Sequence, residues 1–261
     1  MSPNQLPGSG RAPAHTPGHW LLAQLGKKVL RPGGKETTTW LLDHADIAGK
    51  NVVEFAPGLG VTAQDILSRL PKSYIGIDRD ADAAAHAATR LAGRGEVRVG
   101  HADATGLPDD SCDIVVGEAM LSMHTDKLKR DILREAARIL TPGGILVSHE
   151  LLLTPNTLAE EYKTHIRHDL ARAIHVNARP LTVHEWSTLA ADAGLTMRDH
   201  YQTDMALLEP RRLIADEGLG VVTIAKNLVT KPAARSQVLA MRAAFRRHRE
   251  HLGAIGAIYV K

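Results

Sequence analysis

The stretch VVEFAPGLG at residues 52–60 is an apolar run that leads directly into a glycine-containing turn. A second apolar run, YIGI at residues 74–77, ends at Asp78, about 20 residues beyond the first glycine of that turn. The glycines permit a tight turn and a close approach of the backbone to a ligand. A helix predicted over residues 61–70 would point its unpaired N–H groups at that ligand, and the Asp78 carboxylate could accept both hydroxyls of a ribose. The pattern predicts an adenosine-containing cofactor.

The glycine turn does not by itself identify the cofactor. Residues 58–63, GLGVTA, satisfy the pattern G-x-G-x-x-G/A, so a nicotinamide-dependent oxidoreductase remains an alternative at this point. The order of elements downstream is more specific. Apolar runs predict strands at 96–99, 112–121 and 145–148, and an amphipathic helix precedes the last of these. Strands that alternate with helices indicate an α/β fold with a mostly parallel sheet.

Five motifs occur in the order and at the spacing of a known family. They are EFAPGLG (54–60), GIDRD (76–80), DATGLP (103–108), DIVVGEAML (113–121) and LTPGG (140–144). Over roughly residues 50–150 the sequence resembles the class I S-adenosylmethionine-dependent methyltransferases, in their small-molecule branch. The resemblance implies a Rossmann-like seven-stranded sheet of order 3-2-1-4-5-7-6, with strand 7 antiparallel and with helical lid insertions. One departure is Cys112, where the family usually has an aromatic residue.

The resemblance also implies which residues contact the methionyl part of the cofactor. Gly58 and Gly60 would pass close to it, and Glu54 would approach its ammonium group. Glu118 and Ala119 would border the methionyl end and the substrate entrance. Glu54 could instead cap the following helix. The same turn supplies the two remaining predicted contacts, Ala56 and Pro57.

At the nucleoside end, the resemblance implies that Asp78 accepts the ribose hydroxyls and that Arg79 lies along the adenine. Asp103 would accept from the adenine amino group, while the Ala104 N–H would donate to a ring nitrogen. Either aspartate could also be an ordinary turn residue at a strand end.

Residues 32–34, Pro-Gly-Gly, interrupt the segment 20–30 before a helical stretch at 36–44. In relatives of this kind the segment before strand 1 often closes over the cofactor. Arg31 and the backbone of Gly33 could therefore meet the methionyl carboxylate. A simple linker turn is the alternative.

Methyl transfer depends mainly on alignment and on the exclusion of water, because the sulfonium cofactor is already activated. Some nucleophiles also need a general base. His149 is the predicted catalytic base, since it lies at a strand end on the ligand side of such a sheet. The predicted substrate-pocket residues are His124, Glu150, Tyr162 and His165.

Two segments, 158–177 and 209–251, exceed what the sheet needs and are predicted to form helical lids. In the first, Ile166, Leu170 and Ile174 form an apolar stripe, with polar residues including His165 opposite. That polar face could line a substrate pocket, supply imidazoles for a metal, or be a solvated face. No metal site is predicted, because the single cysteine adds no ligand and no carboxylate partner is specified.

The second lid segment is predicted to contain two helices separated near Lys231-Pro232. Between the lids, Thr182 and Glu185 form a capping-box pattern at the start of a helix ending at Gly194. A strand is expected from about Met197 into Met205. The apolar run 253–260 suits a buried antiparallel last strand.

The chain of 261 residues is long enough for one domain, which we place at residues 20–261. Residues 1–19 are rich in Pro and Gly and lack an apolar signal core, so a disordered tail is expected. No run approaches the ~18 apolar residues of a membrane span. A single cysteine excludes an internal disulfide and fits the cytoplasm.

A net charge of +3 and an aromatic content of 3% disfavour nucleic acid as a partner. The basic residues at 242–251 could bind an anionic partner or form a solvated helix face. We therefore predict methyl transfer from S-adenosylmethionine to a small, apolar or anionic molecule. The alternatives are an NAD(P)-dependent oxidoreductase and a non-catalytic S-adenosylmethionine-binding regulatory protein.

Overall fold

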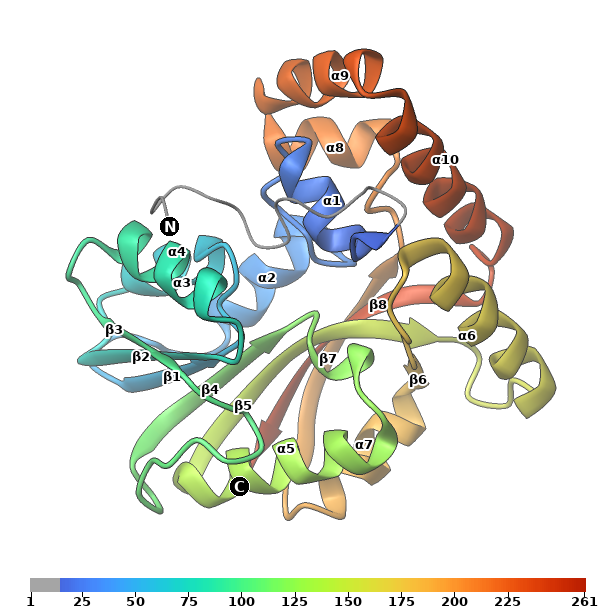
Figure 1. The fold of residues 1–261 in the computed structure, drawn as a ribbon. Helices are drawn as coiled ribbons and strands as arrows, with labels where there is room; N and C mark the ends of the chain where they lie inside the picture. The colour runs from blue at the N-terminus through green and yellow to red at the C-terminus, as the bar shows by residue number, and fades with distance from the viewer. Residues whose placement is uncertain (1–14) are drawn as a thin grey trace.

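The computed structural model describes residues 15–261, which form a mixed sheet with helices on both faces (Figure 1). The strand order is β3-β2-β1-β4-β5-β8-β7, and a short β6 pairs with β5. Of the strands formed by these described residues, only β8 runs antiparallel to its neighbours, which are β5 and β7. The bounds are β1 Asn51–Phe55, β2 Ser73–Asp78, β3 Glu96–Val99, β4 Cys112–Glu118, β5 Leu140–Leu153, β6 Leu181–Thr182, β7 Thr196–Asp204 and β8 Leu252–Val260. This order confirms the predicted topology. The short β6 was not predicted, so the strands predicted as 6 and 7 are β7 and β8 in the structure.

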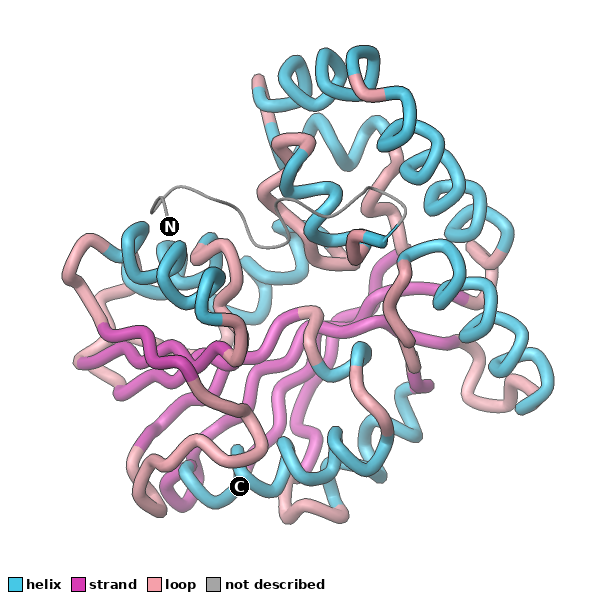
Figure 2. Tube along the Cα trace, in the orientation of Figure 1, coloured by secondary structure: helices cyan, strands magenta, loops and turns pink. Residues whose placement is uncertain are grey.

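The helices fall into three groups (Figures 1 and 2). One group covers the upper face of the sheet in the view of Figure 1, namely α2 Gly34–Asp43, α3 Val61–Leu67 and α4 Ala81–Leu91. The lower face is covered by α5 Asp126–Ile139 and α7 Val183–Ala191. The remaining helices form a cap, which we define as α1 Gly18–Gln24, α6 Glu160–Ile174, α8 Pro210–Glu217, α9 Gly220–Thr230 and α10 Pro232–Arg247.

Both faces of the central strands are buried, which explains why these strands read as continuous apolar runs rather than alternating ones. Val115 of β4 packs in the cluster that contains Ile132 of α5 and Trp186 of α7. Its neighbour Ile114 points the other way, into the cluster that contains Ile66 of α3. The cap has a separate apolar cluster that extends from α1 to α10.

The start of α7 confirms the predicted capping box. The Glu185 N–H donates to Thr182 Oγ1 over 3.2 Å, and the Thr182 N–H donates to Glu185 Oε2 over 2.7 Å. The helix ends at Ala191, before the predicted Gly194. Likewise α3 ends at Leu67, short of residue 70, where the backbone has turned to a φ of +55°.

The second lid segment contains three helices where two were predicted. Pro232 begins α10 as expected, since a proline fits the first turn of a helix. The additional break lies at Gly218, whose φ of +54° and ψ of −128° separate α8 from α9.

The predicted boundary at residue 19 also differs from the structure. Residues 1–14 lie outside the described residues. However, α1 already begins at Gly18, and Gly18 is buried. A Cβ at Gly18 would lie 2.8 Å from the Met241 sulfur, so this glycine allows α1 to pack closely against α10. Among residues 15–261, no helix has the length and apolar character needed to cross a membrane.

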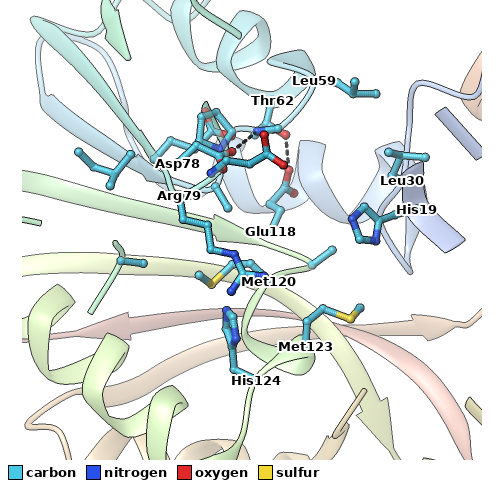
Figure 3. Close-up of a pocket in the computed structure, with 18 of the residues that line it drawn as sticks. His19, Leu30, Leu59, Thr62, Asp78, Arg79, Glu118, Met120, Met123 and His124 are labelled. Carbon is cyan, nitrogen blue, oxygen red and sulfur yellow. Dashed lines mark hydrogen bonds between the residues drawn. The ribbon is translucent and has the colours of Figure 1, made fainter. Parts of the chain in front are cut away.

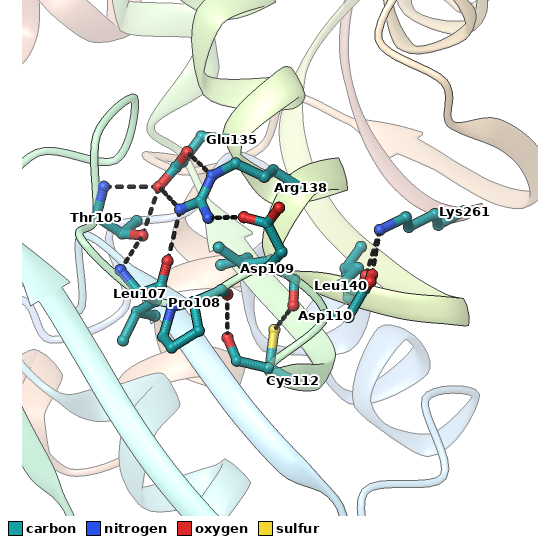
Figure 4. Close-up of polar contacts among 12 residues, drawn as sticks. Thr105, Leu107, Pro108, Asp109, Asp110, Cys112, Glu135, Arg138, Leu140 and Lys261 are labelled. Carbon is teal, nitrogen blue, oxygen red and sulfur yellow. Dashed lines mark hydrogen bonds and ion pairs between the residues drawn. The ribbon is translucent and has the colours of Figure 1, made fainter.

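The loop between β3 and β4 is fastened to α5 by a polar network (Figure 4). Arg138 donates to the Leu107 carbonyl and to Glu135 and Asp109, and Glu135 accepts the Thr105 N–H over 2.8 Å. The hydrogen bonds from Arg138 hold the pKa of Glu135 at about 2. Cys112 is buried beside this loop, and burial raises the pKa of its thiol to about 12. The family's aromatic position is thus filled here by a buried, neutral thiol.

Candidate active site

A cavity of about 480 Å³ opens at the carboxyl ends of β1, β2 and β4 (Figure 3). Gly58, Asp78 and Glu118 line it from the sheet side. Pro17, His19 and Trp20 line it from the first turn of α1 and the residue before it. Its volume is within the usual range of small-molecule sites, and ligands in open α/β sheets bind at this edge.

The turn after β1 requires glycines because of its backbone conformation and, at Gly60, also because of close packing. Gly58 and Gly60 have φ values of +54° and +67°, which a residue with a Cβ rarely adopts. Gly58 lines the cavity, whereas Gly60 does not. A Cβ at Gly60 would lie 3.2 Å from the Cα of Ala87, so Gly60 permits the close packing of α3 on α4. Ala56 and Pro57 line the cavity as expected from the sequence.

The Asp78 carboxylate fixes the same turn. It accepts the Gly58 N–H over 3.1 Å and the Asp80 N–H over 3.0 Å. Burial raises the pKa of Asp78, and these two backbone hydrogen bonds oppose the increase. Arg79 and Asp103 line the cavity beside it.

Ala104 is the exception among the residues predicted at the nucleoside end. It does not line the cavity, and its N–H donates to the His101 carbonyl over 3.1 Å within a tight turn. The backbone donor expected for an adenine nitrogen is therefore already used.

Glu54 also lines the cavity, near the end of β1. Its side chain is buried, and the Tyr74 hydroxyl donates to Oε2 over 2.5 Å. Burial raises the pKa of Glu54 to about 8, although the Tyr74 hydrogen bond opposes the increase. At pH 7 this carboxyl group is largely protonated.

Glu118, at the end of β4, has the opposite character. Burial disfavours its charge, but the positive charge of Arg31 and a hydrogen bond from His149 prevail and lower its pKa to about 2. Arg31 Nη1 donates to Oε2 over 2.8 Å, and the hydroxyls of Thr38 and Thr62 also donate to this carboxylate. The pair is almost completely buried, with 6% of each side chain exposed.

Arg31 has one donor left over. Its Nη2 is buried without a hydrogen-bond partner among the described residues, although Arg31 lines the cavity. Arg31 is a lining residue of the cavity, and a guanidinium with an unsatisfied donor suits an anionic partner.

His149 and Gly33 do not reach the cavity, which corrects two expectations. The His149 ring is fully buried, and its Nε2 accepts the Gly33 N–H over 2.9 Å. Its Nδ1 lies 3.2 Å from Glu118 Oε1. Burial lowers the pKa of His149, so the neutral ring carries its proton on Nδ1 and donates to Glu118. Both ring nitrogens are engaged, and neither can serve as a base for a substrate in this geometry.

Of the predicted substrate-pocket residues, only His124 lines the cavity. Glu150 is buried and accepts the N–H groups of Met120, Leu121 and Ser122 over 2.8–3.1 Å. It therefore holds the loop after β4 in place. Ala119, also in that loop, lines the cavity and has a φ of +53°.

Tyr162 and His165 lie on the outer side of α6, away from the cavity. The Tyr162 ring packs edge-on against His251, and the His165 ring packs against His248. The side of α6 that faces inward is the apolar stripe that contains Leu170 and Ile174. The polar face of this helix is thus a solvated face.

Within residues 15–261 one group has metal-ligand character, formed by His165, Asp169 and His248 within 4.8 Å of one another. Asp169 accepts from His248 Nε2 over 2.9 Å, from Arg247 over 3.0 Å and from Arg172 over 2.8 Å. These hydrogen bonds lower the pKa of Asp169 below its usual range. Two guanidinium groups already neutralise the carboxylate, so we assign the group as an ion-pair network that joins α6 to α10.

Sequence reasoning expected the segment before β1 to close over the cofactor but singled out only Arg31 and Gly33 in it, and it missed the other residues of the N-terminal wall of the cavity. His19, Trp20, Lys28 and Leu30 all line it. The apolar run at residues 20–25 could have indicated a helix. However, nothing local to that run shows that it lies over the carboxyl ends of strands that begin at residue 51.

Comparisons with known proteins agree with this architecture. Residues 52–144 match a family model described as a methyltransferase domain. A relative from Haemophilus influenzae, described as an uncharacterized protein, is 36% identical over 217 residues, which is 80% of this chain and 84% of the relative. The crystal structure of MccD protein has a TM-score of 0.69 at 18% identity, over 88% of this chain and 98% of that one.

A further solved structure is similar and contains a cofactor. Phosphoethanolamine N-methyltransferase 2 from Haemonchus contortus, in complex with S-adenosyl-L-methionine, has a TM-score of 0.68 at 17% identity, over 94% of this chain and 56% of that one. A structure of the same enzyme with phosphomonomethylethanolamine and S-adenosylhomocysteine has a TM-score of 0.69 at 16% identity, over 97% of this chain and 59% of that one.

The sheet order and the matching family model define a Rossmann-like methyltransferase. The chain belongs to the class I methyltransferases, and the similar enzyme from Haemonchus contortus was solved with S-adenosyl-L-methionine bound.

Proposed function

We propose that this enzyme transfers the methyl group of S-adenosylmethionine to a small-molecule acceptor. The observation that carries the proposal is the size of the cavity that residues of α1 and of the segment 28–31 line together with the strand ends. A cavity of about 480 Å³ is within the size range of small-molecule sites and has room for the cofactor and a small acceptor.

The cofactor supplies an activated methyl group on a sulfonium, and this chain supplies its binding and orientation. In the proposal Asp78 accepts the ribose hydroxyls and Arg79 lies along the adenine. Arg31 Nη2 donates to the methionyl carboxylate, which supplies the partner that this buried atom otherwise lacks. Glu54 accepts from the methionyl ammonium. All four residues line the same cavity, which suits a ligand that combines a nucleoside with an amino acid.

The proposed acceptor class is tested by following the methyl label. The enzyme is incubated with S-adenosylmethionine that carries a radiolabelled methyl group and with a cell extract divided into small-molecule, protein and nucleic-acid fractions. We expect label to transfer only in the presence of the small-molecule fraction. Transfer into protein or nucleic acid would contradict the proposal. Tight cofactor binding with no transfer in any fraction would favour the non-catalytic reading.

The role proposed for Glu54 predicts that cofactor binding releases a proton. Without cofactor, burial keeps the pKa of Glu54 at about 8, so the group is protonated below that pH. An ammonium group beside the carboxylate favours its charged form and lowers the pKa again. At pH 6.5, where the α-amino group of the cofactor is itself protonated, binding should release close to one proton.

The proton count is measured by calorimetric titration in buffers that differ in ionisation enthalpy. Glu54→Gln is the matched variant, because glutamine keeps the size of the side chain and cannot titrate. It should release no proton. An equal proton count in wild type and Glu54→Gln would remove Glu54 from this role.

A further inference from the structure

A second, smaller cavity of about 50 Å³ adjoins the first. It lies between the cap helices and the carboxyl end of β5, and Leu22 of α1, Ile174 of α6 and Phe245 of α10 line it. Four residues, His19, Leu30, Ala119 and Met123, line both cavities and form their common boundary.

The lining of the small cavity is apolar apart from His19. Three methionines, Met123, Met205 and Met241, contribute to it alongside aliphatic and aromatic groups. Methionine side chains adapt their shape, so such a pocket can enlarge around an apolar guest. A polar or charged guest would lose its hydration there without gaining hydrogen bonds. Among the residues that the structure describes, no cationic side chain lines this pocket, whereas Lys28, Arg31 and Arg79 line the large cavity.

His19 lines both cavities, and Figure 3 shows its side chain among those that line the large one. Among residues 15–261 neither of its ring nitrogens has a hydrogen-bond partner, although its ring packs 4.8 Å from that of Trp20. Burial, together with the charge of Arg79, lowers the pKa of His19 to about 4. At pH 7 the ring is therefore neutral, with one nitrogen able to accept a hydrogen bond from a bound hydroxyl, amine or thiol.

We propose that the small cavity is the acceptor subsite, and that it selects a molecule that is apolar except for the heteroatom to be methylated. In this arrangement the apolar part occupies the pocket and the heteroatom hydrogen-bonds to His19, beside the cofactor cavity. The inference rests on the proposed function, because it specifies the acceptor of the same reaction. Of the two acceptor types expected from the sequence, it favours the apolar one.

Two probes with the same number of heavy atoms test this preference, namely 1-butanol and 1,3-propanediol. The protein is first saturated with S-adenosylhomocysteine, and probe binding is followed by saturation-transfer NMR. We expect binding of 1-butanol only. The ring signals of His19 should shift with 1-butanol and stay unchanged with the diol.

Pocket-filling variants provide the matched controls. Leu22→Phe and Ile174→Phe each place a larger ring in the small cavity, and neither residue lines the large one. Each should abolish the 1-butanol signal. Leu239→Phe makes the same kind of change on the exposed side of α10 and should leave the signal intact. Binding of S-adenosylhomocysteine by each variant verifies that it is folded.

The outcomes separate this proposal from the one on which it rests. Failure of the wild-type protein to bind S-adenosylhomocysteine would count against the proposed function itself. If S-adenosylhomocysteine binds normally, two probe results would overturn the acceptor subsite and leave the proposed function standing. One is that the diol binds to the same extent as 1-butanol, and the other is that neither probe binds. A 1-butanol signal that persists in folded Leu22→Phe or Ile174→Phe has the same consequence, because the alcohol then binds elsewhere.

Discussion

Replacing Asp78 with alanine is expected to weaken binding of S-adenosylmethionine and S-adenosylhomocysteine by at least about 100-fold. A hydrogen bond to a charged group contributes about 1.5–3 kcal/mol, and the ribose offers two hydroxyls, so a loss of roughly 3 kcal/mol is a conservative estimate. The variant also loses the acceptor for the Gly58 N–H, which holds the turn after β1 in its bound shape. Calorimetric titration measures the change directly.

Two further variants show which of these losses dominates. Asp78→Asn keeps an acceptor for the Gly58 N–H but removes the charge, so its affinity should lie between those of wild type and Asp78→Ala. Asp82→Ala removes an exposed carboxylate from the first turn of α4 and should bind like wild type. If Asp78→Ala retained wild-type affinity, the ribose assignment would be wrong. If the wild-type protein bound NADH and neither S-adenosylmethionine nor S-adenosylhomocysteine, the cofactor would belong to a different class.

The turn after β1 and Asp78 could be predicted from the sequence, because residues close together in the chain determine this part of the site. The turn at residues 56–60 and Asp78 belong to consecutive strand ends, and adjacent parallel strands bring such ends together. The chain between them is short, and glycines at positive φ leave few other conformations. Spacing along the chain is therefore a good guide to spacing in the structure here.

The buried polar groups could not be predicted in this way. His149 bonds to Gly33, which is 116 residues away in the sequence, and Arg31 pairs with Glu118, which is 87 residues away. A histidine at a strand end is compatible with catalysis and with burial, and only the packing of α2 against β5 decides between them. Once the Gly33 N–H and Glu118 occupy both ring nitrogens, His149 has no contact left for a substrate.

The cap helices show what hydrophobic periodicity can and cannot predict. Periodicity correctly placed Leu170 and Ile174 on one side of a helix and His165 on the other, but it did not show which side faces the site. The pocket lies inside the cap, so the apolar side of α6 lines it and the polar side meets solvent. His19 was missed for a related reason. Its segment has the composition of a tail and acquires order by packing against α6 and α10.

Replacing Arg31 with methionine is expected to lower the free energy of unfolding by about 3 kcal/mol at pH 7, because it leaves the buried charge of Glu118 without its cation. Arg242→Met is the matched control. Arg242 pairs with Glu209 at the surface, where 31% and 39% of the two side chains are exposed. An exposed pair contributes only about 0–1 kcal/mol, so this control should unfold close to wild type. Equal denaturation midpoints for the two variants would contradict the assignment of a stabilising buried pair.

The pH dependence identifies Glu118 as the source of the loss. Its pKa of about 2 in the folded protein lies below the reference value of 4.5, so its contribution to stability is fully present above pH 4.5 and is lost as the pH falls toward 2. A difference of this size corresponds to about 3 kcal/mol, in agreement with the expected cost. The gap between wild type and Arg31→Met should therefore narrow as the pH is lowered from 7 to 3.5. Adding Glu118→Gln to Arg31→Met removes the unpaired charge, so this double variant should recover part of the lost stability at pH 7. Urea denaturation at pH 7 compares the wild type, Arg31→Met, the double variant and the control Arg242→Met. Without that recovery, the cost would come from lost packing of the Arg31 side chain.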